Sequence, residues 1–115
     1  MKKILFATFI LLLAACATVK TATLSQQDVD RMLPVFPDLT LAQLNEGKAL
    51  YETNCDKCHM LKDPVAFTET QWRSIVPSMA AKVNKKQANT LSPEGEEKIL
   101  RYLVTLSTAP KPATK

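Results

Sequence analysis

A stripe of apolar residues at helical spacing runs through the stretch from about Leu41 to Asn54. Its members fall at positions i, i+3, i+6 and i+7, on one face of a helix: Leu44, Gly47, Leu50 and Tyr51. Thr40 precedes the stretch and is a residue type that caps helix N-termini. We therefore predict a helix here. Glycine inside a helix costs about 1 kcal/mol relative to alanine, so Gly47 indicates that another helix crosses closely at this point.

A second helix is predicted to begin near Thr68 or Thr70. Its apolar positions are Trp72, Ile75, Val76 and Met79. Pro77 lacks a backbone donor, and we expect it to kink this helix or split it in two. Residues 81–90 contain three lysines and are expected to form a polar connector.

The last helix has the clearest start signal in the chain. Ser92 is a suitable N-cap, Pro93 suits the first helical position, and glutamates follow in the first turns. Its buried face is expected to consist of Ile99, Leu100, Leu103 and Leu106. Residues 107–115 are predicted to be a disordered tail. Three such helices, with little strand-like alternation after residue 40, predict an all-α fold.

The N-terminal segment has the pattern of an export signal. Lys2 and Lys3 precede an apolar run, Ile4 to Leu13, that is too short to span a bilayer in the usual way. Small residues then lead to Cys16, as in the bacterial lipobox, where the chain is cut before an acylated cysteine. We expect residues 1–15 to be a lipoprotein-type signal peptide. An ordinary secretory signal and an uncleaved membrane anchor are the alternatives.

Composition divides the rest of the chain into an anchor region and one domain. Residues 16–39 are expected to be the lipidated Cys16, a polar tether and an entry segment, with a short helical turn at residues 28–32. Residues 40–106 are expected to form the domain itself. A chain anchored in this way belongs in the bacterial cell envelope. Ala17, in place of the aspartate associated with inner-membrane retention, favours the outer membrane facing the periplasm.

The net charge does not favour nucleic acid as a partner. It is +4 for the whole chain, and without Lys2 and Lys3 the balance is 13 basic and 11 acidic residues, or +2. So small a net charge gives no bulk electrostatic argument for a nucleic-acid partner.

The chain has three cysteines and one histidine, and two of the cysteines and the histidine lie in one motif. The segment Cys55-Asp56-Lys57-Cys58-His59 is C-x-x-C-H, the pattern of covalent c-type haem attachment. Two thiols two residues apart reach the two vinyl groups at one edge of the porphyrin, and the adjacent histidine reaches the iron. We therefore predict one haem c bound by Cys55, Cys58 and His59.

Three other uses of this motif fit the chain less well. A thioredoxin-like redox pair is expected beside strands, which the sequence does not predict here. A zinc site needs four ligands, and the only remaining candidate of the usual Cys or His type is Cys16, since the chain has a single histidine. A structural disulfide across two residues is unsuited to a helix end.

The second axial ligand follows by elimination among the methionines. His59 is the only histidine, so the chain cannot supply a second one. Met60 adjoins His59 on the wrong side of the haem, and Met32 lies in a proline-rich segment before the motif. Met79 follows Pro77 and is the ligand we predict. Met32, and an open or lysine-ligated iron, are the alternatives, and Met79 as ordinary core filler is a further one.

Two other residues are candidates for contacts around the haem. The imidazole of His59 needs a partner for its second nitrogen, and the backbone carbonyl of Pro64 is the predicted one; an ordinary turn proline is the alternative. Trp72 is predicted either to bond a haem propionate or simply to wall the pocket.

The residues from about Leu41 to Leu106 resemble a small monohaem class I cytochrome c of the lipoprotein-anchored bacterial type. The resemblance is carried by Gly47 and Tyr51, the C-x-x-C-H motif, Trp72 with Met79, and the final helix through Tyr102. It implies a bundle of three main helices around one covalent haem, with the first and last helices crossing near a right angle. It also implies Met79 as the sixth ligand. The stretch between His59 and Met79 is shorter than in larger members.

These features predict a monomeric, periplasm-facing carrier of single electrons rather than an enzyme. Its partners would be redox proteins, with the membrane engaged through Cys16 and with no small-molecule substrate. A haem-based gas or redox sensor with a labile methionine ligand is an alternative, as is a dedicated electron-transfer subunit of one oxidoreductase complex. A peroxidase of the bacterial type is disfavoured because such enzymes usually need two haems.

Overall fold

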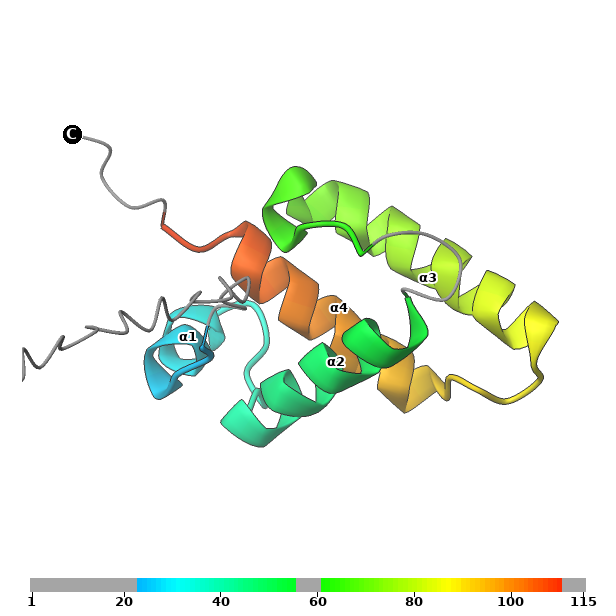
Figure 1. The fold of residues 1–115 in the computed structure, drawn as a ribbon. Coiled ribbons are helices and arrows are strands. Elements are labelled where there is room, and N and C mark those ends of the chain that lie inside the picture. The colour runs from blue at the N-terminus through cyan, green and yellow to red at the C-terminus, as the bar shows by residue number, and fades with distance from the viewer. Residues whose placement is uncertain (1–22, 56–60, 111–115) are drawn as a thin grey trace, which may run out of the picture.

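Four α-helices and one short 3-10 helix make up the computed structural model, which describes residues 23–55 and 61–110 (Figure 1). In chain order they are α1 (Gln26–Met32), α2 (Leu41–Asn54), η1 (Pro64–Ala66), α3 (Glu69–Lys86) and α4 (Pro93–Ser107). No strand occurs in these residues, so the predicted all-α class is confirmed. The signal peptide and three of the predicted site residues, Cys16, Cys58 and His59, lie outside the described residues.

The starts of α2 and α4 agree with the sequence because local capping fixes them. The side chain of Thr40 accepts a hydrogen bond from the backbone N–H of Gln43 at 3.1 Å. Ser92 accepts one from the backbone N–H of Gly95 at 3.0 Å, and Pro93 occupies the first turn of α4. Each cap satisfies a backbone donor that has no partner within the helix.

The helix α3 is longer than the sequence predicted. It runs as one α-helix through Pro77, so the expected split does not occur, and it continues to Lys86. The prediction of a connector over residues 81–90 is therefore wrong for its first six residues. A buried stripe made up of Trp72, Val76, Ala80 and Val83 explains the continuation. Burial of these side chains outweighs the single backbone hydrogen bond lost at Pro77.

The turn after α3 is held by the side chain of Asn84. Its amide donates to the carbonyl of Leu91 at 2.9 Å, and its oxygen accepts from the backbone N–H of Leu91 at 2.8 Å. Within this turn Asn89 has a positive φ of 59°, a conformation that asparagine tolerates better than most residues. The turn therefore leads directly into the N-cap of α4.

The helix α4 lies between α2 and α3 and contacts both, and it also contacts η1 (Figure 1). Gly47 marks the closest approach of α2 to α4. A Cβ atom built there would lie 2.1 Å from the backbone oxygen of Lys98 and 3.0 Å from Cβ of Tyr102. The prediction that another helix crosses closely at Gly47 is confirmed, and its partner is α4.

The entry segment belongs to the same hydrophobic core. Its buried side chains are Leu24, Val29, Met32, Phe36 and Leu39. The core therefore begins before residue 40, and α1 starts two residues earlier than the turn predicted at 28–32.

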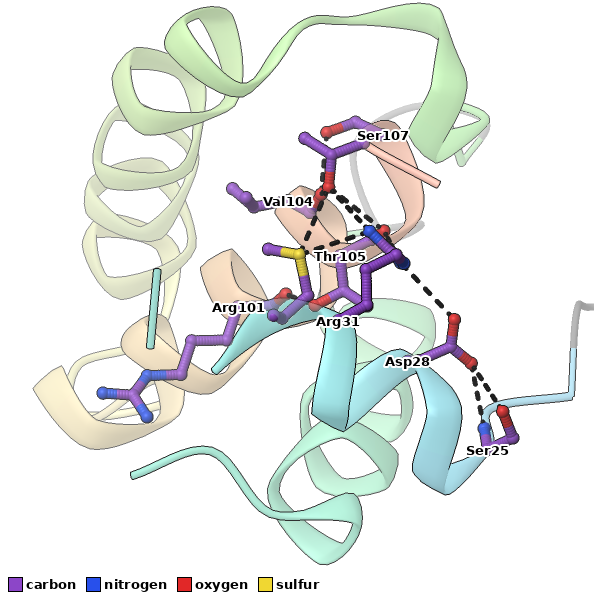
Figure 2. Close-up of polar contacts among 9 residues, drawn as sticks. Ser25, Asp28, Arg31, Arg101, Val104, Thr105 and Ser107 are labelled. Carbon is purple, nitrogen blue, oxygen red and sulfur yellow. Dashed lines mark hydrogen bonds and ion pairs between the residues drawn. The ribbon is translucent and has the colours of Figure 1, made fainter. Parts of the chain in front are cut away.

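Arg31 ties α1 to the C-terminal end of α4 (Figure 2). Its guanidinium donates to the backbone oxygen of Thr105 at 2.9 Å and to the hydroxyl of Thr108 at 3.3 Å. It also pairs with Asp28 at 3.4 Å on its own helix. The carbonyls of the last turn of a helix have no partner within it, so Arg31 satisfies one of these groups while it fixes α1 in place.

None of the helices in the described part of the chain has the length and apolar character needed to cross a membrane.

Candidate functional site

An apolar cavity of about 250 Å³ lies among α2, α3, α4 and the segment that follows the C-x-x-C-H motif. Most of its wall comes from α3 and α4, through Ile75, Val76, Met79, Ala80, Ile99 and Leu103. Phe67 and Trp72 lie beside this wall. The described residues thus enclose an apolar space at the C-terminal end of α2.

The end of α2 brings Cys55 to this cavity. Cys55 is the C-cap residue of α2, and its backbone N–H donates to the carbonyl of Tyr51 at 3.0 Å. Its side chain is partly buried and lines the cavity. The segment 56–61 joins Cys55 to Lys62, and both of these residues line the same cavity. The two described residues that flank this stretch of the motif, Cys55 and Lys62, therefore lie on one cavity.

Met79, the predicted axial ligand, lines the cavity from α3. The other described methionine lies elsewhere. Met32 is 2% exposed in the core, and its sulfur accepts hydrogen bonds from Arg31 at 3.3 Å and from Thr108 at 3.4 Å. Of the described methionines, only Met79 shares an apolar space with Cys55.

Trp72 and Pro64 are in direct contact. The indole N–H of Trp72 donates to the carbonyl of Pro64 at 2.8 Å, and the indole lines the cavity. The only side-chain donor of Trp72 is therefore engaged by Pro64, and both predicted roles of Trp72 beside a haem stay predictions. A carbonyl oxygen has two lone pairs, so that of Pro64 retains a place for a second donor. The contact predicted between Pro64 and His59 stays a prediction.

Aromatic rings pack around Trp72. Phe67 meets it edge-on with ring centres 5.0 Å apart, and Tyr51 meets it edge-on at 6.3 Å. These are the arrangements that aromatic quadrupoles favour. The rings stiffen the side of the cavity that α2, α3 and the segment 62–67 share.

Sequence reasoning missed the hydroxyl of Tyr51. It donates to the backbone carbonyl of Lys62 at 2.5 Å, and the ring is only 6% exposed. Burial of the ring, with a smaller effect from the nearby Cys55 side chain, raises the pKa of Tyr51 to about 12. The phenol therefore stays protonated and remains a donor at neutral pH. The only sign of this hydrogen bond in the sequence is the residue type, because a tyrosine occupies a position in the apolar stripe that a purely hydrophobic side chain could fill.

The donor set and the cavity suit a haem group. A porphyrin has two broad apolar faces, and the described walls are apolar. The sulfur atoms of Cys55 and Met79 both belong to residues of this wall, and a thiol and a thioether are two of the protein groups that hold a c-type haem with histidine and methionine as ligands. The motif residues that would complete the set, Cys58 and His59, lie in the segment joining Cys55 to Lys62.

A search of protein-family models, of curated proteins and of solved structures gave no match to this chain.

Proposed function

We propose that this chain is a single-electron carrier that holds one haem c. Cys55 and Cys58 would bind it through thioether bonds, and His59 and Met79 would be the axial ligands. The observation that carries the proposal is that Cys55, the first residue of C-x-x-C-H, shares one apolar cavity with Met79. In fold terms, α2, α3 and α4 would be the three main helices of a cytochrome c-like bundle.

A haem iron, when bound, exchanges one electron between its ferric and ferrous states. The residues of the chain would set how readily this happens. Methionine opposite histidine raises the reduction potential. Val76, Ile99 and Leu103 line the cavity with apolar side chains. These would keep water away from a bound haem, and exclusion of water disfavours the extra positive charge of ferric iron. With His59 and Met79 both bound to the iron, no position would be open to a substrate, which favours a carrier over an enzyme.

The anchor remains part of the proposal. Acylation at Cys16 with more than one chain would hold the protein stably at a membrane, because each buried CH₂ contributes about 0.8 kcal/mol and a single chain binds only marginally. The carrier would then work at the bacterial outer membrane, facing the periplasm, and would meet redox proteins in brief encounters of the kind that small interfaces support.

Substitution of Met79 tests the ligand assignment. The chain would be exported together with a haem-maturation system, and its absorption spectrum and redox titration would be compared with those of Met79→Ala. We expect the variant to lose the ferric absorption of the methionine–iron bond and to have a lower reduction potential.

Met32→Leu is the matched control. It removes the other described methionine with a side chain of similar volume, which cores usually tolerate at a cost below about 1.5 kcal/mol. Its spectrum and potential should match those of the unchanged chain. A Met79→Ala spectrum identical to that of the control would remove Met79 from the ligand set and would favour the sensor alternative with another ligand or an open iron.

A further inference from the structure

The turn that follows α1 presents a run of apolar residues to solvent. Leu33 is 38% exposed and Val35 is 44% exposed. The two prolines of the same stretch, Pro34 and Pro37, are exposed as well. Residues 33–37 therefore form a small apolar surface, which we call the 33–37 turn.

Buried neighbours hold this turn in place. Met32 is 2% exposed, Phe36 is 6% exposed, and both belong to the hydrophobic core. Arg31 fixes the end of α1 against the last turn of α4 through its hydrogen bond to the carbonyl of Thr105 (Figure 2). Because these contacts fix the chain on both sides, the exposed side chains of the turn cannot move into the core without unpacking it.

The backbone of the 33–37 turn has little need of water as a hydrogen-bond partner. Proline has no N–H, so Pro34 and Pro37 supply no donor. The N–H groups of Val35 and Phe36 both donate to the carbonyl of Met32, at 3.0 and 2.8 Å. From residue 34 to residue 37, all of which the structure describes, no backbone donor is left for water. An unpaired donor is costly to remove from water, so this turn can enter an apolar environment at low cost.

The charges beside the turn do not suit an anionic partner. Asp30 and Asp38 are exposed. The two nearby guanidinium groups are already paired, since Arg31 lies 3.4 Å from Asp28 and Arg101 lies 3.0 Å from Asp38. A surface without net negative charge therefore complements the 33–37 turn better than an anionic one.

The position of the turn in the chain puts a lipid surface within its reach. Thr23, where the described structure begins, follows Cys16, the proposed acylation site, by seven residues. Those residues span at most about 25 Å, and α1 adds roughly 10 Å. An acylated Cys16 thus keeps the turn within about 35 Å of the bilayer. A contact that is weak on its own becomes populated at the high effective concentration that such a link provides.

We propose that the 33–37 turn rests on the surface of a zwitterionic lipid bilayer, with Leu33 and Val35 in its interfacial region. The inference rests on acylation of Cys16 in the proposed function and does not depend on the haem. Aliphatic side chains and proline rings without free backbone donors suit the boundary between headgroups and acyl chains. Two points of attachment, the acyl chains and the turn, would limit rotation of the domain and restrict which of its faces a redox protein can meet.

Crosslinking of lipid to protein tests the inference on the full acylated chain. The exported chain would be reconstituted into phosphatidylcholine vesicles that contain a phospholipid with a photoactivatable acyl chain. After illumination, trypsin releases residues 32–48, which contain the turn, and residues 74–82 of α3, which include exposed residues but not the turn. Mass spectrometry measures the share of each peptide that carries lipid. We expect label on residues 32–48 and little on residues 74–82.

Leu33→Ser combined with Val35→Ser removes the apolar surface and leaves the core intact. Leu61→Ser combined with Val65→Ser is the matched control, because it makes the same two replacements at side chains that are 39% and 64% exposed elsewhere. We expect the first variant to lower the label on residues 32–48 by about tenfold, the factor gained when two half-exposed aliphatic side chains leave water. The control should be labelled as the unchanged chain is.

The lipid composition of the vesicles gives a second readout that needs no substitution. Addition of anionic phosphatidylglycerol should leave the label on residues 32–48 unchanged or lower it, since Asp30 and Asp38 are exposed beside the turn. Label that rises with phosphatidylglycerol would mean that basic residues bring the domain to the membrane, and it would overturn the inference.

The remaining outcomes separate this inference from the proposed function. An exported chain without acyl chains, by intact mass, would overturn the proposed anchor and the inference with it. An acylated chain labelled equally on the two peptides, or equally in the two double variants, would overturn the inference alone. A turn that carries no lipid and crosslinks to a second copy of the chain would do the same. An acylated chain without haem that is still labelled at the turn would overturn the electron-carrier proposal and support the inference.

Discussion

Replacement of Gly47 by alanine adds only one methyl group, but we expect it to lower the free energy of unfolding substantially. The added Cβ would lie 2.1 Å from the backbone oxygen and 2.7 Å from the backbone carbon of Lys98. Neither atom can rotate away, so α2 and α4 would have to separate by about 1 Å to restore an ordinary contact. Overpacking of this kind costs about 1–3 kcal/mol or more, whereas alanine gains only about 1 kcal/mol in helix propensity. Because the clash is with backbone, the cost lies at the upper end of this range, and we expect a net loss of about 2 kcal/mol in the free energy of unfolding.

Gly95→Ala provides the comparison, because the atoms nearest its added Cβ belong to side chains. They are Oγ of Ser92 at 3.3 Å and Cδ1 of Leu50 at 3.4 Å, so small side-chain shifts can relieve the contact. We expect its free energy of unfolding to lie within about 1 kcal/mol of the wild type. Urea unfolding followed by circular dichroism measures both variants. Equal stabilities of Gly47→Ala and Gly95→Ala would refute the close crossing of α2 and α4.

Two further predictions concern the anchoring of α1 and the response to high pH. Arg31→Met should lower the free energy of unfolding by about 1–2 kcal/mol, because its charged donor bonds a carbonyl of α4. Arg73→Met breaks an exposed pair with Glu69 and should cost less than about 1 kcal/mol, and similar losses in the two variants would contradict this account of α1. The raised pKa of Tyr51, about 12 against 10 for a free tyrosine, stabilises the fold fully below pH 10 and loses that effect as the pH rises toward 12. Unfolding measured from pH 9 to 11.5 should therefore show declining stability, with a shallower decline in Tyr51→Phe, and parallel curves would contradict the assignment.

The sequence predicted best those elements whose ends are set by local chemistry. Thr40 and Ser92 cap their helices through hydrogen bonds within three residues, so the starts of α2 and α4 are visible without knowledge of the fold. The end of α3 was predicted wrongly because tertiary burial decides it. Val83, surrounded in sequence by lysine and asparagine, is 6% exposed in the core and carries the helix past the point where its polar neighbours suggested a connector.

In the candidate site too, features set by nearby residues could be predicted from the sequence, and features set by tertiary contacts could not. Residue type and spacing were enough to single out Cys55 and Met79, and the structure places both on one cavity. The hydrogen bond from Tyr51 to Lys62 links residues 11 apart across the motif. No local pattern encodes such a bond, because it depends on how the chain returns after residue 61.

The most direct test of the proposed haem is a mass measurement on the exported chain. Produced with a haem-maturation system and digested with a protease that leaves residues 55–59 on one peptide, the protein should yield that peptide with the mass of one haem added. Conversion of Cys55 and Cys58 to alanine together should abolish the addition. A peptide without haem after export alongside a working maturation system, or one carrying zinc in its place, would contradict the account.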